Sequence, residues 1–325
     1  MTKDINTIDV IIPVYNGEKF IREAINSVLE QTISPDHIFI IDDGSTDNTE
    51  KIIKEYVSKY SGKIIYHLKK NGGPSSARNI GLSLSKSYFV AFLDSDDIWV
   101  KDKLEKQLSI FNNTNYLNLG LVYCNANIQD SNKSNIHYPA PEIDRSVKGI
   151  VFLKMLIANK TVSSASGVLI KKEVFNKVGI FDESLSFVED WDMWLRIAEK
   201  YEMDFVDERL VNIRRHDNNR TVSIGKSLIG EIDFYNKWIE NIKDKNIIPQ
   251  KWADAVAICL ILNFPNVKKI IKILKKIPQK TRSVLFRKTF GSVFIYCIYF
   301  CIHKLFNLNE WGRIYKYLKN KIKYD

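Results

Sequence analysis

The sequence predicts an α/β fold in which a mostly parallel central sheet carries flanking helices and is followed by a helical C-terminal region. Short runs rich in β-branched residues alternate with amphipathic stretches over the first 125 residues. The strand-like runs are almost continuously apolar, as expected for a parallel sheet that helices cover on both faces. Repeated β-α-β units of this kind are joined by right-handed crossovers.

Four apolar runs are predicted as strands, and the stretches between them as helices. The strands are expected at IDVIIPV (8–14), HIFIID (37–42), KIIYHL (63–68) and YFVAFLD (88–94). The helices are expected at EKFIREAINSVLEQ (18–31), TEKIIKEYVSKY (49–60) and SSARNIGLSLS (75–85). Because parallel strands point the same way, their carboxyl ends meet at one edge of the sheet.

A further helix is predicted over FVEDWDMWLRIAEKY (187–201), within a less regular middle section. Apolar residues recur there at spacings of three and four: Val188, Trp191, Trp194, Leu195 and Ala198. Glu189 and Asp190 fall in its first turn, where the helix dipole favours carboxylates. From about residue 226 the sequence is typical of successive helices.

The composition is that of an ordinary globular protein. The chain has 325 residues, of which 45% are hydrophobic and 26% charged, with 14 Gly and 8 Pro. These values exclude collagen-like, disordered and disulfide-scaffold proteins. Four scattered Cys do not predict a zinc site, and the first residues lack a signal-peptide pattern. We therefore expect a cytoplasmic protein.

The net charge of +10 is concentrated near the C-terminus. From Lys268 to Asp325 there are 15 Lys and Arg residues but only two acidic ones. An uncharged stretch from Thr289 to Ile302 has 14 residues, whereas a membrane-spanning helix needs about 20. We expect this tail to contact an anionic membrane surface peripherally, and we expect no nucleic-acid partner. The alternative is a helical subdomain that packs on the rest of the chain or on a second subunit.

Acidic residues follow two predicted strands, at the edge where open α/β sheets bind ligands. The segments are IDDGSTDNTE and AFLDSDDIW. Neither a G-x-G-x-x-G motif nor a P-loop is present. Clustered carboxylates repel one another, and Mg²⁺ binds one or two of them together with phosphate oxygens. The segments predict a metal and phosphate site, with ordinary turn and cap chemistry as the alternative.

Five motifs then carry a family resemblance. VIIPVYNGE, IDDGSTDNT, NGGPSSARNIGL, FLDSDD and VEDWDMWLR, in that order, resemble the motif series of the inverting glycosyltransferases of family 2, of the bacterial envelope or capsule polysaccharide type. The resemblance covers about residues 8 to 220. It implies a GT-A, Rossmann-like catalytic domain over 1–225, with a nucleotide-sugar half (1–125) and an acceptor half (126–225). A basic helical region is expected over 226–325.

The resemblance assigns nucleotide-binding residues in the first half. Pro13 and Tyr15 are expected beside the base. Asp43 is similar to the carboxylate that accepts the imide hydrogen of uracil or thymine, with Asp42 as its neighbour. Arg78 resembles the basic residue that helps to hold this site, and a helix-surface ion pair is its alternative.

Asp94 and Asp96 match the Asp-x-Asp motif, with Ser95 between them in the nucleotide site. The resemblance implies that Asp94 faces ribose and metal and that Asp96 binds the Mg²⁺ or Mn²⁺ bridging both phosphates. Asp97 is an alternative for that second role, or a cap in a solvated turn. His216 is expected as a further metal or diphosphate ligand, and Arg214 as a phosphate clamp.

The catalytic residues implied are Asp190, as the base that takes the proton of the acceptor hydroxyl, and Glu189 as its neighbour. Either acid could instead only satisfy the helix N-terminus. Trp191 and Trp194 could stack on sugars, although core packing is the expected role of Trp194.

The expected function is metal-dependent transfer of a single hexosyl or N-acetylhexosaminyl group. The donor is a UDP- or dTDP-sugar, and the acceptor is a lipid-linked or cell-envelope glycan at the inner face of the cell membrane. Single transfer is favoured because a Gln-x-x-Arg-Trp motif and a run of transmembrane helices are missing. The alternatives are a sugar-phosphate nucleotidyltransferase and a non-catalytic membrane-bound scaffold. The sequence is also compatible with a homo-oligomer.

Overall fold

The computed structural model describes residues 6–130, 137–139, 149, 152, 155, 164–216, 219, 230, 233, 234, 237 and 238. The chain divides into two units, Met1–Gly230 and Glu231–Asp325. Every site residue predicted above lies in the first unit. The predicted helical C-terminal region and its membrane contact fall almost wholly outside the described residues. None of the helices in the described part of the chain has the length and apolar character that crossing a bilayer requires.

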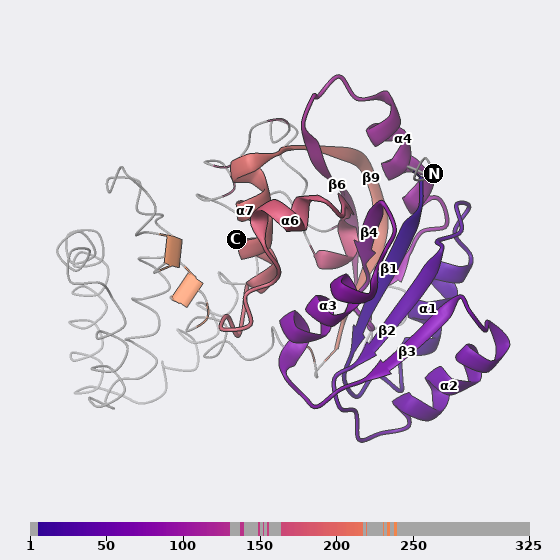
Figure 1. Ribbon diagram of the computed structural model, residues 1–325. Coiled ribbons are helices and arrows are strands. Elements are labelled where there is room, and N and C mark those ends of the chain that lie inside the picture. The colour runs from indigo at the N-terminus through magenta and orange to yellow at the C-terminus, as the bar shows by residue number, and fades with distance from the viewer. Residues whose placement is uncertain are drawn as a thin grey trace, which may run out of the picture. The chain divides into compact units, whose positions relative to one another are not determined.

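The first part of the sheet is parallel, as predicted. Its strands are β1 (Ile8–Val14), β2 (His37–Asp42), β3 (Ile64–Leu68) and β4 (Phe89–Phe92), joined through helices α1 (Ile21–Leu29), α2 (Thr49–Lys59) and α3 (Gly73–Leu84). The strands lie side by side in the order β3-β2-β1-β4 (Figure 1). All seven residues of β1 are buried, which explains why all of them except Asp9 are apolar.

Alternate residues of β1 face different helices, so the sheet is covered on both sides. Ile8, Val10, Ile12 and Val14 belong to one core cluster with the buried residues of α1 and α2. Ile11 faces α3 instead, because a Cβ built on Gly81 would come within 2.4 Å of the Ile11 side chain. Gly81 therefore permits the close approach of α3 to the opposite face.

The second part adds strands in both directions, so the complete sheet is mixed. Its elements are β5 (Ile98–Trp99), α4 (Lys103–Asn113), β6 (Leu119–Asp130), β7 (His137–Pro139), the short 3-10 helix η1 (Ala165–Gly167), β8 (Leu169–Lys171), α6 (Val174–Val178), α7 (Glu189–Lys200) and β9 (Glu202–Arg215). The strand order is β3-β2-β1-β4-β8-β6-β9-β5, and β7 pairs with β6. β8 runs antiparallel to β4 and β6. This places η1, which precedes β8, beside the carboxyl end of β4.

Candidate active site

The predicted site residues gather at the carboxyl-end edge of the parallel strands, and contacts link their motifs. The Asn16 backbone N–H donates to Ser45 Oγ (2.9 Å), and Asn16 Oδ1 accepts from the Thr46 N–H (2.8 Å). Asn16 has a left-handed φ of 51°, which Asn adopts more readily than most residues. A Cβ on Gly17 would lie 3.6 Å from Ser95 Oγ. The loop after β1 therefore lies against the loops after β2 and β4.

Pro13 and Tyr15 differ in what they offer a ligand. Pro13 is buried within β1. The side chain of Tyr15 is 52% exposed just beyond the end of that strand. Tyr15 is accordingly the one of the two whose ring is accessible to a planar group.

The adjacent acids Asp42 and Asp43 have different partners, although both are buried. Asp42 accepts from the Ser45 N–H (2.8 Å) and from the Tyr66 hydroxyl (3.0 Å). Burial, together with this carboxylate, raises the pKa of Tyr66. Both oxygens of Asp42 are thus used in holding the turn and β3, so its role in this structure is to support the turn.

Asp43 binds the beginning of helix α3. Its Oδ1 accepts from the Gly72 N–H (2.8 Å) and from Lys69 Nζ, and its Oδ2 accepts from the Gly73 N–H (2.7 Å). Gly73 has a φ of 87°, a conformation that glycine adopts without strain. An ionised carboxylate offers about four lone-pair sites, so three donors leave room for one more. Asp43 can cap α3 and still accept a hydrogen bond from a base.

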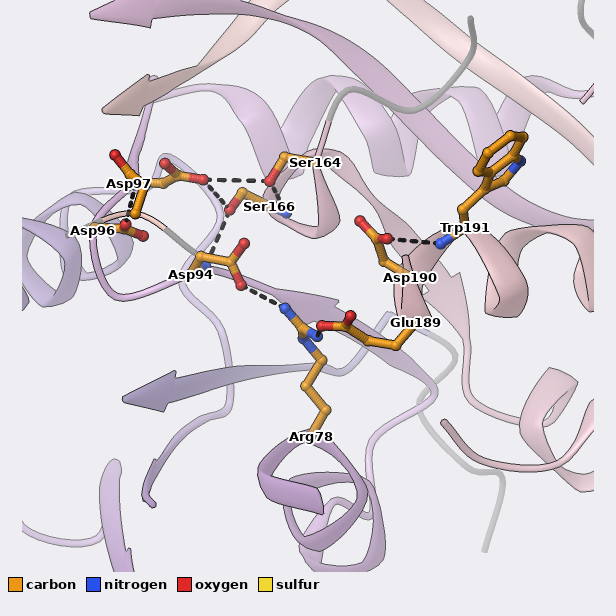
Figure 2. Close-up of polar contacts among 10 residues, drawn as sticks. Arg78, Asp94, Asp96, Asp97, Ser164, Ser166, Glu189, Asp190 and Trp191 are labelled. Atoms are coloured by element: carbon orange, nitrogen blue, oxygen red, sulfur yellow. Dashed lines mark hydrogen bonds and ion pairs between the residues drawn. The ribbon is translucent and has the colours of Figure 1, made fainter. Parts of the chain in front are cut away.

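Arg78 joins the two halves of the site, and its side chain is buried. Its Nη2 donates to Asp94 Oδ1 (2.7 Å) and its Nη1 to Glu189 Oε1 (3.2 Å) (Figure 2). Its guanidinium also lies over the Phe181 ring, 5.5 Å from the centroid. Burial disfavours the charged form, but the Asp94, Glu189 and Asp190 charges outweigh it and raise the pKa of Arg78. The alternative of a helix-surface ion pair is wrong.

The three acids after β4 form a tight turn, closed by a hydrogen bond from the Asp97 N–H to the Asp94 carbonyl (2.9 Å). Asp94 and Asp96 are partly exposed, whereas Asp97 is buried. Asp97 accepts from Ser166 Oγ (2.6 Å) and from the Arg214 N–H (3.2 Å). The alternative of a solvated Asp97 that caps the next helix is therefore wrong, and α4 begins after Asp102.

Residues from the end of β9 hold Asp96. His216 Nε2 lies 3.1 Å from Asp96 Oδ2, and Asn219 Nδ2 donates to the same oxygen (3.0 Å). The His216 ring stacks on Phe20 at 4.6 Å between centroids. His216 was expected to be a metal or diphosphate ligand; in this structure its Nε2 contacts Asp96, and the ligand role stays a prediction. Asn219 was not identified from the sequence, because an isolated Asn carries no motif.

Arg214 is engaged by protein groups rather than exposed as a phosphate clamp. Its guanidinium contacts Glu23 Oε2 (3.0 Å), the Phe20 carbonyl (3.3 Å) and the Asp96 carbonyl. It also stacks over the Phe20 ring, 4.7 Å from the centroid. Its role is to fix the backbone of the Asp-x-Asp turn.

Asp94 and Asp96 fit a divalent cation. Burial and the Asp94 charge raise the pKa of Asp96, although His216 opposes the rise, so the turn accumulates negative charge that lacks full compensation. The contacts of Asp96 with the His216 and Asn219 side chains both go to Oδ2. No group of three or more His, Cys, Asp and Glu side chains in the described ranges is arranged to bind a metal. Two carboxylates completed by phosphate oxygens match the donor set that Mg²⁺ prefers.

Helix α7 presents the second pair of acids at its first turn, as predicted. Val188, which precedes the helix, has a left-handed φ of 53°, an unusual conformation for a β-branched residue. Glu189 is buried against Arg78, whereas Asp190 is partly exposed and accepts from the Trp191 N–H (2.7 Å). Burial and the Glu189 charge raise the pKa of Asp190 to about 6, while Arg78 acts to lower it. A carboxylate with this pKa is suited to accept a proton near neutral pH.

Trp191 and Trp194 are core residues of α7. Trp194 is fully buried, and its ring meets Phe181 edge to face. Trp191 is 5% exposed, and its Nε1 donates to the Met155 carbonyl (3.0 Å). The core alternative therefore holds for both rings, and neither is placed to stack on a sugar.

Comparison with known families and sequences gives a consistent result. A family model described as Glycosyl transferase family 2 matches residues 9–179. An uncharacterized glycosyltransferase of Rickettsia prowazekii is 30% identical over 241 residues, which are 74% of either chain. One of Rickettsia typhi is 33% identical over 214 residues, 66% of this chain and 65% of that protein. The minor teichoic acid biosynthesis protein GgaB of Bacillus subtilis is 29% identical over 226 residues, but these are 24% of its length.

Solved structures show the same fold at low identity. Residues 1–349 of S. aureus TarS in complex with UDP-GlcNAc match with a TM-score of 0.61 and 17% identity, covering 89% of both chains. The same fragment in complex with UDP matches with a TM-score of 0.54 and 19% identity. The likeness covers a mixed α/β sheet with flanking helices, the GT-A type of fold.

Proposed function

Because the chain belongs to glycosyl transferase family 2, we propose that it is a metal-dependent inverting glycosyltransferase. It transfers one hexosyl or N-acetylhexosaminyl group from a UDP- or dTDP-sugar to a hydroxyl of a lipid-linked or cell-envelope glycan. The catalytic domain in this proposal spans residues 1–225. The observation that carries it is the Arg78 bridge, which ties the acids of the donor side to the acids of α7.

The donor nucleotide is proposed to bind across the ends of β1, β2 and β4. At the end of β1, the ring of Tyr15 is accessible to the base. Pro13, which is buried in the same strand, forms part of the wall of the proposed base site. Asp43 accepts the imide hydrogen of the base. The turn that Asp42 supports holds Asp43 in place. UDP and UDP-GlcNAc in the complexes of S. aureus TarS support this class of donor.

Asp94 and Asp96 are proposed to hold Mg²⁺ or Mn²⁺, with Ser95 between them and His216 against Asp96. When bound, the cation supplies positive charge that stabilises the departing diphosphate. The chain itself fixes both acids: Arg78 holds Asp94 Oδ1, and His216 holds Asp96 Oδ2.

Asp190 is proposed as the general base and Glu189 as the residue that positions it. Glu189 is buried and paired with Arg78, so Asp190 is the acid that an acceptor hydroxyl can reach. As the acceptor oxygen bonds to the anomeric carbon, its proton passes to Asp190. The bond from that carbon to the diphosphate oxygen breaks on the opposite face, and its electron pair leaves with the diphosphate. The product configuration is therefore inverted.

The acceptor and location are proposed from relatives and from charge. The Bacillus subtilis relatives GgaB and GgaA are minor teichoic acid biosynthesis proteins, which supports an envelope glycan as acceptor. The tail after Lys268 is rich in Lys and Arg, which suits a peripheral position at the inner face of the cell membrane.

The test is release of nucleotide from a panel of UDP- and dTDP-sugars with Mn²⁺, with and without a chelator. The proposal predicts slow release of UDP or dTDP from one or a few donors, stopped by the chelator. Pyrophosphate released from a nucleoside triphosphate and a sugar phosphate would instead identify a nucleotidyltransferase. Absence of both reactions would favour a non-catalytic scaffold.

A further inference from the structure

A serine outside the predicted motifs contacts two of the three acids after β4. Ser166, in η1, is fully buried. Its hydroxyl donates to Asp97 Oδ2 (2.6 Å) and accepts from the backbone N–H of Asp94 (3.0 Å) (Figure 2). One side chain thus binds both ends of the turn that carries Asp96.

The backbone around Ser166 is held by hydrogen bonds from buried side chains of other elements. Trp99 Nε1 donates to the Ser166 carbonyl (2.8 Å). Gln107 Nε2 donates to the next carbonyl, that of Gly167 (2.8 Å), and to the Val122 carbonyl (3.0 Å). Trp99 and Gln107 are themselves buried. Because its backbone is fixed to β5, α4 and β6, the hydroxyl of Ser166 has a defined position relative to the sheet.

Asp97 receives donors from two separate segments of the chain. Ser164 Oγ donates to Asp97 Oδ2 at 3.3 Å, alongside Ser166. The Arg214 N–H donates to Asp97 Oδ1 (3.2 Å). Both carboxylate oxygens of Asp97 thus accept hydrogen bonds from protein groups, and Asp97 is buried. Asp94 and Asp96 are partly exposed.

We propose that Ser166 is a positioning residue of the donor site, which acts through Asp97 and the Asp94 amide. Its two hydrogen bonds hold the turn so that Asp94 and Asp96 present their carboxylates at the ligand edge of the sheet. Asp97 then helps Ser166 to hold the turn and is not a ligand of the cation. The assignment rests on the proposed function and names a residue that the family motifs do not include.

The test measures binding of UDP, or of dTDP if the wild-type chain binds that nucleotide instead, in the presence of Mn²⁺ by calorimetry, on the full chain and on three variants. Ser166→Ala removes both hydrogen bonds, and Ser166→Cys keeps the volume but provides only a weak donor. Ser85→Ala is the matched control, because Ser85 is equally buried and its hydroxyl donates to buried Asp9 (2.7 Å), away from the site. Melting temperature is recorded for each.

Both Ser166 variants loosen the turn that carries Asp94 and Asp96, so we expect each to weaken UDP affinity by about tenfold, the size of effect that loss of a hydrogen bond typically has. Ser85→Ala should lower the melting temperature by about as much as Ser166→Ala does, but it should bind UDP as the wild type does. The assignment is overturned if both Ser166 variants bind UDP normally, if Ser166→Cys alone does, or if Ser85→Ala loses as much affinity. A wild-type chain that binds neither UDP nor dTDP would overturn the proposed function, and this assignment with it.

Discussion

Asp190 and Glu189 are neighbours in the sequence, but their surroundings give them different roles. Glu189 is bound to buried Arg78, whereas Asp190 is partly exposed and keeps one oxygen beyond its contact with the Trp191 N–H. A base must reach the proton it removes, so exposure favours Asp190. The first prediction follows from this difference.

Asp190→Asn should lower turnover by about a hundredfold or more while leaving UDP affinity nearly unchanged, because it removes proton abstraction and no donor contact. Asp204→Asn is the control, since Asp204 makes the same contact with the next backbone N–H (2.9 Å), outside the site. Turnover and calorimetric affinity are measured for both. If Asp190→Asn keeps its turnover, the base lies elsewhere, and Glu189 and Asp192 are then the next acids to replace.

The pKa of Asp190 determines how kcat/KM depends on pH. Because the pKa of Asp190 is raised to about 6, the base is protonated below that pH, and kcat/KM should fall as the pH falls through about 6. The charge of Glu189 raises this pKa, so Glu189→Gln should move the acid limb to lower pH. A limb that stays in place or moves to higher pH would contradict this account of the pair.

Arg78 connects three elements: it lies in α3 and forms ion pairs with Asp94 after β4 and with Glu189 at the start of α7. Arg78→Met would leave Asp94 and Glu189 without their cation, and loss of one partner from a buried ion pair typically costs about 3 kcal/mol or more. We expect that loss in denaturant unfolding, together with weaker UDP binding.

Arg22→Met is the matched control for Arg78. Arg22 pairs with Glu55 between α1 and α2 at 2.7 Å, with the two side chains 48% and 50% exposed. An exposed pair of this kind contributes little to stability, because water and salt screen the two charges. Equal losses of stability in the two variants would show that Arg78 is not a structural tie.

The alternation of β1 to β4 with three helices could be predicted from the sequence, because β1, β2 and β4 are almost wholly buried and so consist mainly of apolar residues. The edge strand β3 is buried only at its first residue, and its run is less apolar. Helix α7 was equally clear, since its core residues recur at helical spacing. The acids that follow two of these strands placed Asp43 and Asp94 at the ligand edge, whereas the family resemblance supplied the role expected of Asp190. Each of these features depends on residues close together in the sequence, so the spacing of apolar and acidic residues is enough to predict it.

The contacts that determine what each acid does were not visible in the sequence. Ser166 lies in a run of small residues, and its link to Asp97 joins positions 69 residues apart. The antiparallel strand β8 has three residues, too few to show a period. Asp42 and Asp43 look alike in sequence, and only the positions of Tyr66 and of the α3 N-terminus separate their roles.

At the scale of the whole molecule, the basic tail should attach the enzyme to membranes. The 325-residue chain is expected to sediment with vesicles containing phosphatidylglycerol and to be released as salt rises, since each Lys or Arg near the surface contributes about 1 kcal/mol that salt screens. Truncation at Ile261 should abolish sedimentation and leave UDP binding intact, because every proposed donor-site residue lies before that point.

Uncharged phosphatidylcholine vesicles are the control for the tail, and they should bind far less protein. Sedimentation that ignores salt and lipid charge would contradict an electrostatic attachment. Loss of UDP binding on truncation would mean that the tail is part of the catalytic fold or of a subunit interface, and the membrane proposal would then be dropped.

The central claim, an inverting transfer with Asp190 as base, is tested most directly by the anomeric configuration of the sugar released. With Mn²⁺ and an α-linked UDP-sugar that the panel identifies as donor, proton NMR during early turnover should show the β anomer, formed together with UDP. Asp190→Asn should form it at least about a hundredfold more slowly. Initial release of the α anomer, or an unchanged rate in Asp190→Asn, would contradict the account.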